Sequence, residues 1–395
     1  MSSTGRACHI RHITDDAKHI FQEIRAQREL EALVAMANED PIAPYRTRPW
    51  RPRFVVWELT LMCNMRCAHC GSSAGRARDD ELSLDQMLRV CDELGELECE
   101  RVTLLGGEPL IHPHWEQVAA RIRSNGYRAN VITNGWTLDE HLCDRIAAAQ
   151  LSIVGISVDG MRESHDKLRR RSGSFDRILH GMKLLKERNL PIAVATVVTN
   201  DSLDDLEQMY ELLTEHDVGV WQLQIGAPLG RLQKDDPVLM RVDRLPQLLD
   251  FIENKQALGH RPRVDMADCV GYYSPQEMRG IRAKTPGGAM FWTGCHAGIQ
   301  AMGLDSNGTV KGCQSLPSTP AYMEGNVRDR SLKDIWNDPA AFRYTRRFSL
   351  SDLREGCAAC RYGALCKGGC TSGAISHTGC AGDNPMCWQR VAGSR

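Results

Sequence analysis

The chain has 395 residues, 42% of them hydrophobic and 25% charged, which suits one large globular domain with a smaller one attached. Its formal net charge of −1 gives no electrostatic basis for binding nucleic acid or an anionic membrane surface. We find no apolar run long enough to span a bilayer, and the first residues lack the apolar stretch of a secretory signal, so we expect a cytoplasmic protein.

Residues 1–48 predict an N-terminal helical extension. Between Ile20 and Ala37, apolar side chains recur at helical spacing, namely Ile24, Leu30, Leu33 and Val34. A linker with four prolines follows, at Pro41, Pro44, Pro49 and Pro52. The stretch is too short for a separate winged-helix peptide-binding domain, and we expect it to pack on the main domain.

In residues 49–255, β-rich runs alternate with amphipathic helical runs. The predicted strands are Phe54–Thr60, Arg101–Leu105, Arg128–Thr133, Ser152–Val158, Ile192–Thr199 and Val218–Ile225. The predicted helices are Ser83–Leu97, Trp115–Ser124, Leu138–Ala149, Phe175–Arg188, Leu203–Glu215 and Arg244–Asn254. This alternation predicts an α/β fold with a parallel sheet, closed into a partial (β/α)6 TIM-like barrel. Ligands of such folds bind at the carboxyl ends of the strands.

The alternation ends near residue 255, and residues 256–294 are expected to form an irregular connecting segment. Residues 295–395 are rich in cysteine and glycine and have little regular pattern. That composition is typical of a small domain organised by metal instead of by an apolar core.

The sixteen cysteines are distributed unevenly. Three lie between Cys63 and Cys70, eight lie between Cys295 and Cys387, and the stretch from Cys143 to Cys269 has none in its interior. In a reducing compartment, clustered thiols indicate metal binding more than disulfides. We expect Cys8, Cys91, Cys99 and Cys143 to be plain thiols.

The first cluster has the spacing Cys63-x3-Cys67-x2-Cys70 and follows the first predicted strand directly. Three thiolates on one loop can hold three irons of a cubane cluster, which leaves the fourth iron open to a small molecule. The spacing alone also allows a zinc knuckle that recruits a distant fourth ligand.

The second predicted strand ends in Gly106-Gly107-Glu108-Pro109. Paired glycines let the backbone approach a ligand closely, and a glutamate can accept a hydrogen bond from an ammonium group. With the three-cysteine loop one βα unit earlier, residues 54–225 resemble the radical S-adenosylmethionine (SAM) superfamily. The resemblance implies that this motif binds the methionyl amine of SAM.

The resemblance also implies a mechanism. The open iron of a [4Fe-4S] cluster chelates SAM, and one electron, from a flavodoxin or ferredoxin, cleaves it to a 5′-deoxyadenosyl radical that abstracts hydrogen from the substrate. Ser157 and Arg169 occupy the places of relatives' contacts to the ribose and carboxylate, with a solvated face as the alternative for Arg169. Asn134 ends the third strand, where an ordinary turn is the alternative, and His69 stands where relatives carry an aromatic residue near the adenine.

The C-terminal cysteines resemble the SPASM extension of radical SAM enzymes. By analogy, a first auxiliary cluster is bound by Cys295, Cys313 and Cys370, and a second by Cys357, Cys360, Cys366 and Cys387. Two points stay open: the fourth ligand of the first cluster is Cys269 or the iron is open, and Cys380 competes with the preferred Cys387. Structural zinc is the alternative for the whole array.

SPASM enzymes mostly modify peptides, so we predict maturation of a ribosomally made precursor peptide, with or without a separate leader-binding protein. Sulfatase-maturing relatives carry an aspartate base where this chain has Gln314, which cannot act as a base, so formylglycine formation is not expected. The alternatives are the same chemistry on a small molecule and a non-catalytic, zinc-organised binding protein.

Overall fold

The computed structural model describes residues 23–47, 49–284 and 289–393. Its centre is a ten-stranded sheet with the order β10-β9-β8-β1-β2-β3-β4-β5-β6-β7. The strands are β1 Phe54–Thr60, β2 Arg101–Gly106, β3 Arg128–Thr133, β4 Ile153–Ser157, β5 Ile192–Val198, β6 Val220–Ile225, β7 Arg263–Met266, β8 Ala301–Leu304, β9 Thr309–Lys311 and β10 Gly325–Asn326. Strands β1 to β7 follow one another in chain order and are all parallel.

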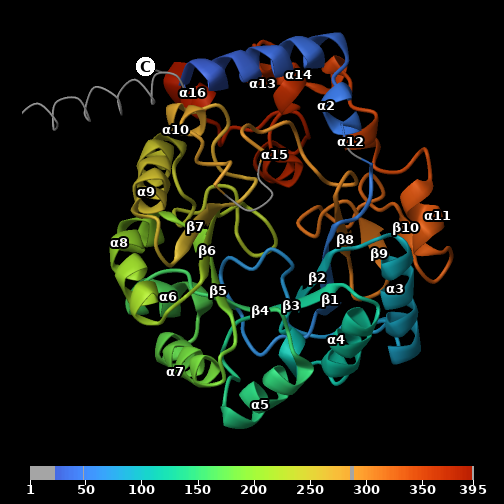
Figure 1. The fold of residues 1–395 in the computed structure, drawn as a ribbon, viewed down its shortest axis with the longest axis vertical. Helices are drawn as coiled ribbons and strands as arrows, with labels where there is room; N and C mark the ends of the chain where they lie inside the picture. The colour runs from blue at the N-terminus through green and yellow to red at the C-terminus, as the bar shows by residue number, and fades with distance from the viewer. Residues whose placement is uncertain (1–22, 48, 285–288, 394–395) are drawn as a thin grey trace, which may run out of the picture.

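Helices cover the outside of the curved sheet, as Figure 1 shows. They are α3 Leu84–Glu96, α4 Trp115–Ser124, α5 Glu140–Ala149, α6 Arg162–Arg169, α7 Ser174–Glu187, α8 Asn200–Glu215 and α9 Leu245–Leu258, with 3-10 turns at Pro109–Ile111 and Val242–Arg244. Local sequence fixes several of their starts. Ser83 and Gln86 form a capping box at α3, and Thr199 and Ser202 form one at α8. This α/β fold with a partial barrel confirms the predicted fold class.

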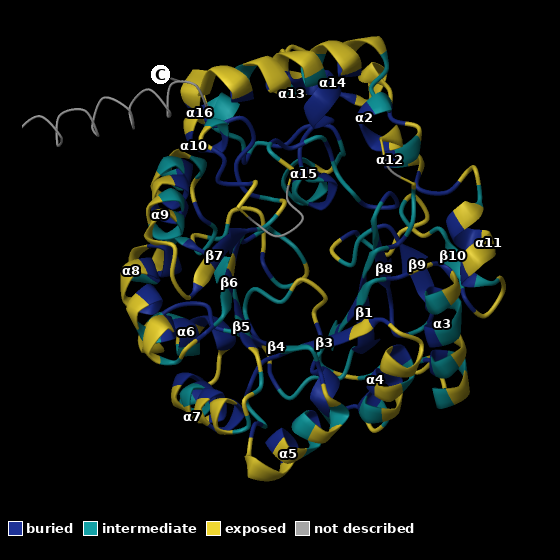
Figure 2. Ribbon diagram, in the orientation of Figure 1, coloured by how far each residue is buried: buried dark blue, intermediate teal, exposed yellow. Residues whose placement is uncertain are grey.

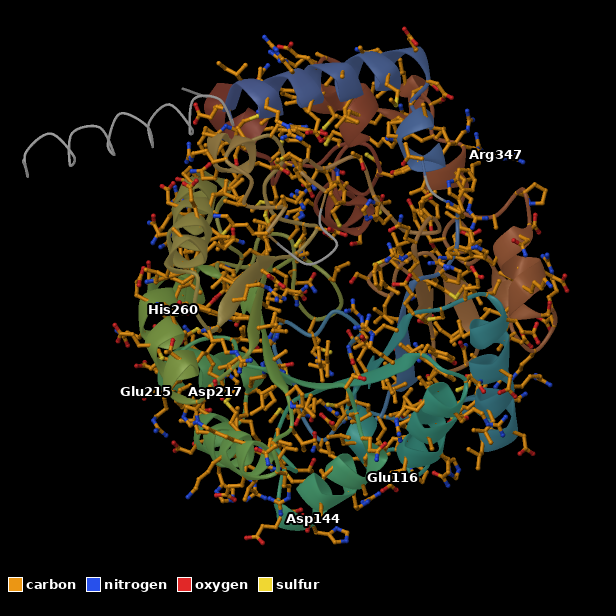
Figure 3. The ribbon with its side chains drawn as sticks, in the orientation of Figure 1. Glu116, Asp144, Glu215, Asp217, His260 and Arg347 are labelled. Atoms are coloured by element: carbon orange, nitrogen blue, oxygen red, sulfur yellow. The ribbon has the colours of Figure 1, made fainter. Side chains whose placement is uncertain are left out.

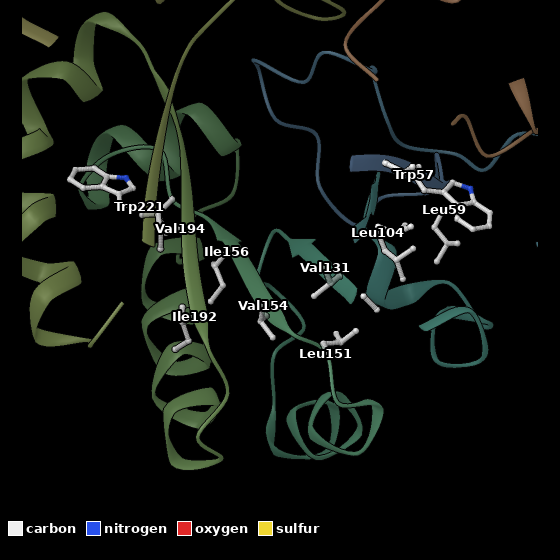
Figure 4. Close-up of a cluster of buried hydrophobic side chains, with 14 of the residues drawn as sticks. Trp57, Leu59, Leu104, Val131, Leu151, Val154, Ile156, Ile192, Val194 and Trp221 are labelled. Carbon is white, nitrogen blue, oxygen red and sulfur yellow. The ribbon is translucent and has the colours of Figure 1, made fainter. Parts of the chain in front are cut away.

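The apolar core lies between the sheet and these helices. Alternate residues of β1, Val55, Trp57 and Leu59, are all buried, as period-two strand geometry requires. Figure 4 shows this layer running along the sheet from Trp57 to Trp221. Figure 2 shows the matching pattern on the helices, whose exposed faces turn outward.

Ion pairs tie neighbouring helices together on the outer surface. Arg145 of α5 binds Glu116 of α4 at 2.9 Å, and Arg188 at the end of α7 binds Asp144 of α5 at 2.6 Å. Figure 3 shows Glu116 and Asp144 on the outer rim of the barrel, away from its centre. These exposed pairs contribute little stability each and keep the outer face hydrated.

Four strands, β7 to β10, lie beyond the predicted end of the alternation, and two of them pair with strands of the predicted barrel. Strand β7 falls in the segment that we expected to be an irregular connection, and it pairs with β6 through Trp221 and Val264. Strand β8 comes from the cysteine-rich segment and pairs in parallel with β1, at the opposite edge. Each has only four residues, too few to produce a periodic signal. The barrel therefore extends past residue 255, and its sheet continues into the cysteine-rich segment.

We call residues 295–393 the C-terminal module. Strands β8 and β9 form a hairpin whose turn contains Gly308 at φ +87°. Its helices are short: α11 Leu332–Asn337, α12 Arg343–Arg346, α13 Glu355–Ala358, α14 Gly363–Cys366, α15 Thr371–Thr378 and α16 Trp388–Gly393, with a 3-10 turn at Leu350–Asp352. Between barrel and module lies α10, Pro275–Met278.

The N-terminal extension is helical at residues 23–39 and at α2, Ala43–Arg46, while residues 20–22 of the prediction lie outside the described residues. Its packing differs from our expectation. Ala26, Leu30 and Ala37 are buried in one cluster with Tyr362 and Leu365 of the C-terminal module and with Tyr272 and Trp292 of the segment after β7 (Figure 1). The helix therefore covers the module and this connecting segment. Among the described residues, no helix has both the length and the apolarity to cross a membrane.

Candidate functional site

The three-cysteine loop leaves β1 and folds back over the carboxyl ends of the strands. The Gly75 N–H donates to Leu61 O at 2.9 Å, and the Cys63 N–H donates to Gly75 O at 3.2 Å, which closes the loop on itself. The Ala68 N–H donates to Leu168 O of α6 at 2.8 Å. The three thiols therefore sit on a loop whose two ends and middle are all anchored to the barrel.

A cavity of about 360 Å³ opens at this loop. Nine of the predicted site residues line it: Cys63, His69, Cys67, Cys70, Gly106, Gly107, Asn134, Ser157 and Arg169. They come from four different strand ends and from α6, as expected for a βα barrel. Glu108 and Pro109 are not among the lining residues. Cys269, Ser315, Ser372 and Gly373, from the segment after β7 and from the C-terminal module, complete the wall.

The Glu108 carboxylate lies buried beneath the cavity and is held by the protein itself. It accepts hydrogen bonds from Thr133 Oγ1 at 2.8 Å, from the Asn134 N–H at 2.8 Å and from the Leu110 N–H at 3.1 Å. Burial raises its pKa from 4.5 to about 7, although these hydrogen bonds oppose the shift. Glu108 thus joins the ends of β2 and β3.

Burial makes two cysteines of the loop reluctant to ionise without metal. It raises the pKa of Cys63 to about 11 and also raises that of Cys67. The Met65 N–H, 3.4 Å from Cys63 Sγ, and Arg169 Nη1, 3.9 Å from Cys67 Sγ, partly offset these shifts. The Ala74 N–H lies 3.3 Å from Cys70 Sγ. Such donors favour thiolate once a metal has displaced the protons.

Arg169 is buried, so the alternative of a solvated face does not hold for it. It forms an ion pair with the buried carboxylate of Asp159 at 2.6 Å, and His69 Nε2 lies 3.2 Å from the same carboxylate. The Arg169 charge holds the pKa of Asp159 well below its usual range, although burial opposes it. The His69 ring is therefore oriented by Asp159 at the edge of the cavity, with Nδ1 buried and without a hydrogen-bond partner in the described part of the chain.

Arg231 is a cavity residue that our sequence reasoning missed. Its guanidinium donates to Cys67 O at 3.1 Å and to Ala74 O, and its backbone N–H donates to Cys70 O at 3.1 Å. These bonds tie the loop after β6 to the cysteine loop. A lone arginine in an irregular loop carries no periodic or motif signal, so the sequence offered no route to it.

The remaining candidate cysteines form two groups. In the first, burial raises the pKa of Cys370 and of Cys313, and the nearby Cys295 adds to both shifts. Cys269 and Cys313 also add to the shift at Cys370. In the second, burial raises the pKa of Cys366, and the nearby Cys387, Cys357 and Cys360 add to it. Cys380 Sγ lies 3.5 Å from Thr378 Oγ1.

Either a single zinc ion or an iron–sulfur cluster can use cysteine groups of this kind. Within the described ranges, no three or more His, Cys, Asp or Glu side chains are arranged to hold one metal ion. A zinc site draws its thiolates to about 2.3 Å from one centre, whereas the thiolates of a cubane bind separate irons and lie farther apart. Cys91, Cys99 and Cys143, which we expect to be plain thiols, are buried in the apolar core, and Cys8 lies outside the described residues.

Two family models match the chain. Residues 57–213 match the radical SAM superfamily, and residues 295–361 match SPASM, an iron–sulfur cluster-binding domain. The chain therefore contains a radical SAM domain and a SPASM domain. The radical SAM match contains the three-cysteine loop and the Gly106–Pro109 motif, while the SPASM match contains Cys295, Cys313, Cys357 and Cys360 and ends before Cys366.

Similar proteins include more than one activity. An AdoMet-dependent heme synthase of Methanosarcina barkeri is 29% identical, covering 83% of this chain and 93% of the relative. The mycofactocin maturase MftC of Mycolicibacterium smegmatis is 27% identical, covering 85% and 81%. The structure of Streptococcus suis SuiB bound to precursor peptide SuiA matches with a TM-score of 0.70 at 15% identity, covering 88% and 78%. That last likeness shows the fold alone.

A radical SAM domain and a SPASM domain together imply SAM and [4Fe-4S] clusters as cofactors, which favours iron–sulfur chemistry over the zinc alternatives. The observed residues fit these groups. Three thiols line a cavity without a fourth cysteine of their loop, and Gly107 lies so close to the loop that a Cβ there would meet Met62 O at 2.0 Å. The radical SAM enzyme chemistry predicted for the chain therefore rests on both the family match and the site.

Proposed function

We propose that this radical SAM enzyme matures a ribosomally made peptide by oxidising one of its residues. The observation that carries the proposal is the size and composition of the cavity, about 360 Å³ with Ser72, Gln224, Ser315 and Ser372 in its walls. Ligand sites commonly span about 300 to 1,000 Å³, and SAM itself must occupy part of this one. The remaining space suits one side chain better than a macrocycle.

The residues of the site divide into those that hold the cluster, those that orient SAM and those that support the cysteine loop. Cys63, Cys67 and Cys70 would hold the cluster, which together with SAM would supply radical hydrogen abstraction from the substrate. The backbone of Gly106 to Pro109 and the side chains of Ser157 and Arg169 orient SAM. Asn134, whose Nδ2 lies 3.9 Å from Cys63 Sγ, and Arg231 hold the cysteine loop in place.

The neighbouring module supports an oxidative outcome. Ser315 and Ser372 line the cavity, and each lies two residues beyond a candidate ligand, Cys313 and Cys370. The substrate position is thus close to the first auxiliary cysteine group, which can hold an acceptor for the electron that an oxidised product must lose. A flavodoxin or ferredoxin supplies the reducing electron. The described cysteines are all free thiols, in keeping with a reducing, cytoplasmic location.

One observation favours a second candidate, a heme-type tetrapyrrole substrate. The AdoMet-dependent heme synthase of M. barkeri matches over 93% of its length, more than the 81% of the mycofactocin maturase. For such a substrate the cavity must widen on binding, because about 360 Å³ is small for SAM and a macrocycle together.

A parallel assay separates the candidates. The anaerobically reconstituted protein is incubated with SAM and reductant, together with either a short peptide encoded beside its gene or Fe-coproporphyrin III. We expect 5′-deoxyadenosine to form and the peptide mass to change, while the tetrapyrrole is unchanged. The Cys63→Ala/Cys67→Ala/Cys70→Ala variant is the control and should form no 5′-deoxyadenosine. A mass change in the tetrapyrrole alone would replace the first candidate with the second.

A further inference from the structure

Cys269 stands at the junction between the barrel and the C-terminal module. It lies three residues beyond β7, and its sulfur accepts the N–H of Ile225, the last residue of β6, at 3.3 Å. This contact fixes the sulfur at the carboxyl end of β6, on the wall of the cavity. Cys269 is therefore held among the strand ends and turned away from the outer surface of the barrel.

A single buried hydroxyl joins the backbone beside Cys269 to the backbone of Cys370. Tyr272 Oη donates to Asp268 O at 2.8 Å and accepts the N–H of Cys370 at 2.9 Å. The Tyr272 ring is fully buried, and a Cβ on Gly369 would meet it at 3.0 Å. The two cysteine-bearing segments are thus packed against the same ring with little freedom to separate.

Cys269 and Cys370 are also connected through the wall of the cavity. Cys370 Sγ lies 3.3 Å from Ser372 Oγ, and Ser372 and Cys269 line the same cavity. Each observation places Cys269 with Cys370.

We propose that Cys269 is the fourth protein ligand of the first auxiliary cluster, together with Cys295, Cys313 and Cys370. All four irons of that cluster are then bound by cysteine, and none is vacant for a substrate atom. The cluster is left with electron transfer as its role. This assignment does not depend on whether the substrate is a peptide or a tetrapyrrole.

The test uses the full chain with the first three cysteines changed to alanine, so that no SAM cluster contributes to the signal. Cys269→Ala is introduced into this background, with Cys380→Ala as the matched control. After anaerobic reconstitution, iron is counted and the EPR spectrum of the reduced protein is recorded with and without cyanide as the probe ligand. The background should bind about eight irons per chain.

We expect cyanide to leave the spectrum of the background and of Cys380→Ala unchanged. In Cys269→Ala, one iron has lost its protein ligand, so cyanide should shift the EPR signal of one cluster. If that cluster does not assemble at all, about four irons per chain should be lost instead. Cys269→Ser, which keeps an oxygen ligand, should retain the irons with an altered spectrum. A cyanide shift with Cys269 intact, or a Cys269→Ala protein identical to Cys380→Ala, would overturn the assignment.

Discussion

Glu108 illustrates how burial sets the behaviour of a single side chain. Its pKa is raised from 4.5 to about 7 by burial, so the folded protein holds this proton more tightly than the unfolded chain does. The stabilisation from that proton is present in full below pH 4.5 and is lost as the pH rises from about 4.5 through about 7. The shift corresponds to about 3 kcal/mol.

We predict that Glu108→Gln flattens the fall in the free energy of unfolding between about pH 4.5 and 7, measured by anaerobic urea unfolding. The control is Glu116→Gln. The hydrogen bond from Arg145 lowers the pKa of that carboxyl, so its titration falls below this window and the variant should keep the slope of the parent. An unchanged slope in Glu108→Gln would show that Glu108 does not titrate there.

The buried pair of Asp159 and Arg169 leads to a second prediction. Removing one partner leaves an uncompensated charge in the interior, which typically costs about 3 to 5 kcal/mol. Asp159→Asn should therefore lower the unfolding free energy by about that amount and free the His69 ring from its partner. Arg162→Ala, which removes an exposed pair with Asp176, should cost less than about 1 kcal/mol in the same urea experiment.

For single residues, the sequence predicted which residues belong to the site better than it predicted which partners their side chains contact. The cysteine spacing and the Gly-Gly-Glu-Pro motif identified the site, since both are local in the chain. Nothing local shows that the Glu108 carboxylate turns toward Thr133, or that Arg231 reaches the cysteine loop from a distance of more than 150 residues in sequence, as its bond to Cys67 does. Those contacts arise only when the strand ends converge.

Among the structural elements, the cysteine loop depends on its fit against the turn after β2. The Gly107 N–H bonds Thr60 O at 2.8 Å, and a Cβ at Gly107 would meet Met62 O at 2.0 Å and Leu61 O at 2.8 Å. These are backbone atoms that cannot rotate away. The loop must move if this glycine is replaced.

We predict that Gly107→Ala loses the first cluster selectively, with iron falling by about four of about twelve atoms per chain after anaerobic reconstitution. Gly95→Ala, in α3, is the control, because a Cβ at Gly95 would meet Asn125 and Tyr127 only at ordinary contact distances of 3.5 Å or more. That variant should keep its full iron content and gain slightly in helix stability. Equal iron in both variants would contradict the proposed fit.

The elements themselves were predictable where their pattern is long. Strands such as Phe54–Thr60 and helices such as Trp115–Ser124 have the bounds that periodicity and flanking turns indicate. The sequence analysis did not predict the four-residue strands β7 and β8, because so short a run has no measurable period. The surface that the N-terminal helix covers was not predicted for another reason. An apolar stripe shows that a helix packs on something, but it does not show which part of the protein it packs on.

On the scale of the whole molecule, the C-terminal module completes the barrel's sheet. Strand β8 covers the edge of β1, and the buried carboxylate Glu58 bonds both Arg78 and, at 3.2 Å, Ser306 of the module. Without the module, that edge and that carboxylate would be uncovered.

We predict that a chain ending at residue 294 is aggregated or largely unfolded, because it exposes the unpaired edge of β1. The control is the full-length chain with Cys357→Ser and Cys360→Ser, which loses cluster ligands but keeps the sheet. Size-exclusion chromatography under anaerobic conditions should show a monodisperse species only for the control. A well-behaved truncated barrel would mean that β8 adds no essential support.

The pairing of β8 with β1 also bears on the speed of electron movement. The rate of electron tunnelling falls steeply as the distance between two redox centres grows. If the centres were bound to two domains that move relative to each other, the rate would change with each movement. Here the loop that follows β1 and the cysteines that flank the β8–β9 hairpin belong to neighbouring strands of one hydrogen-bonded sheet. Backbone pairing thereby fixes the relative positions of these two cysteine-bearing segments, and clusters bound on them would share one rigid support.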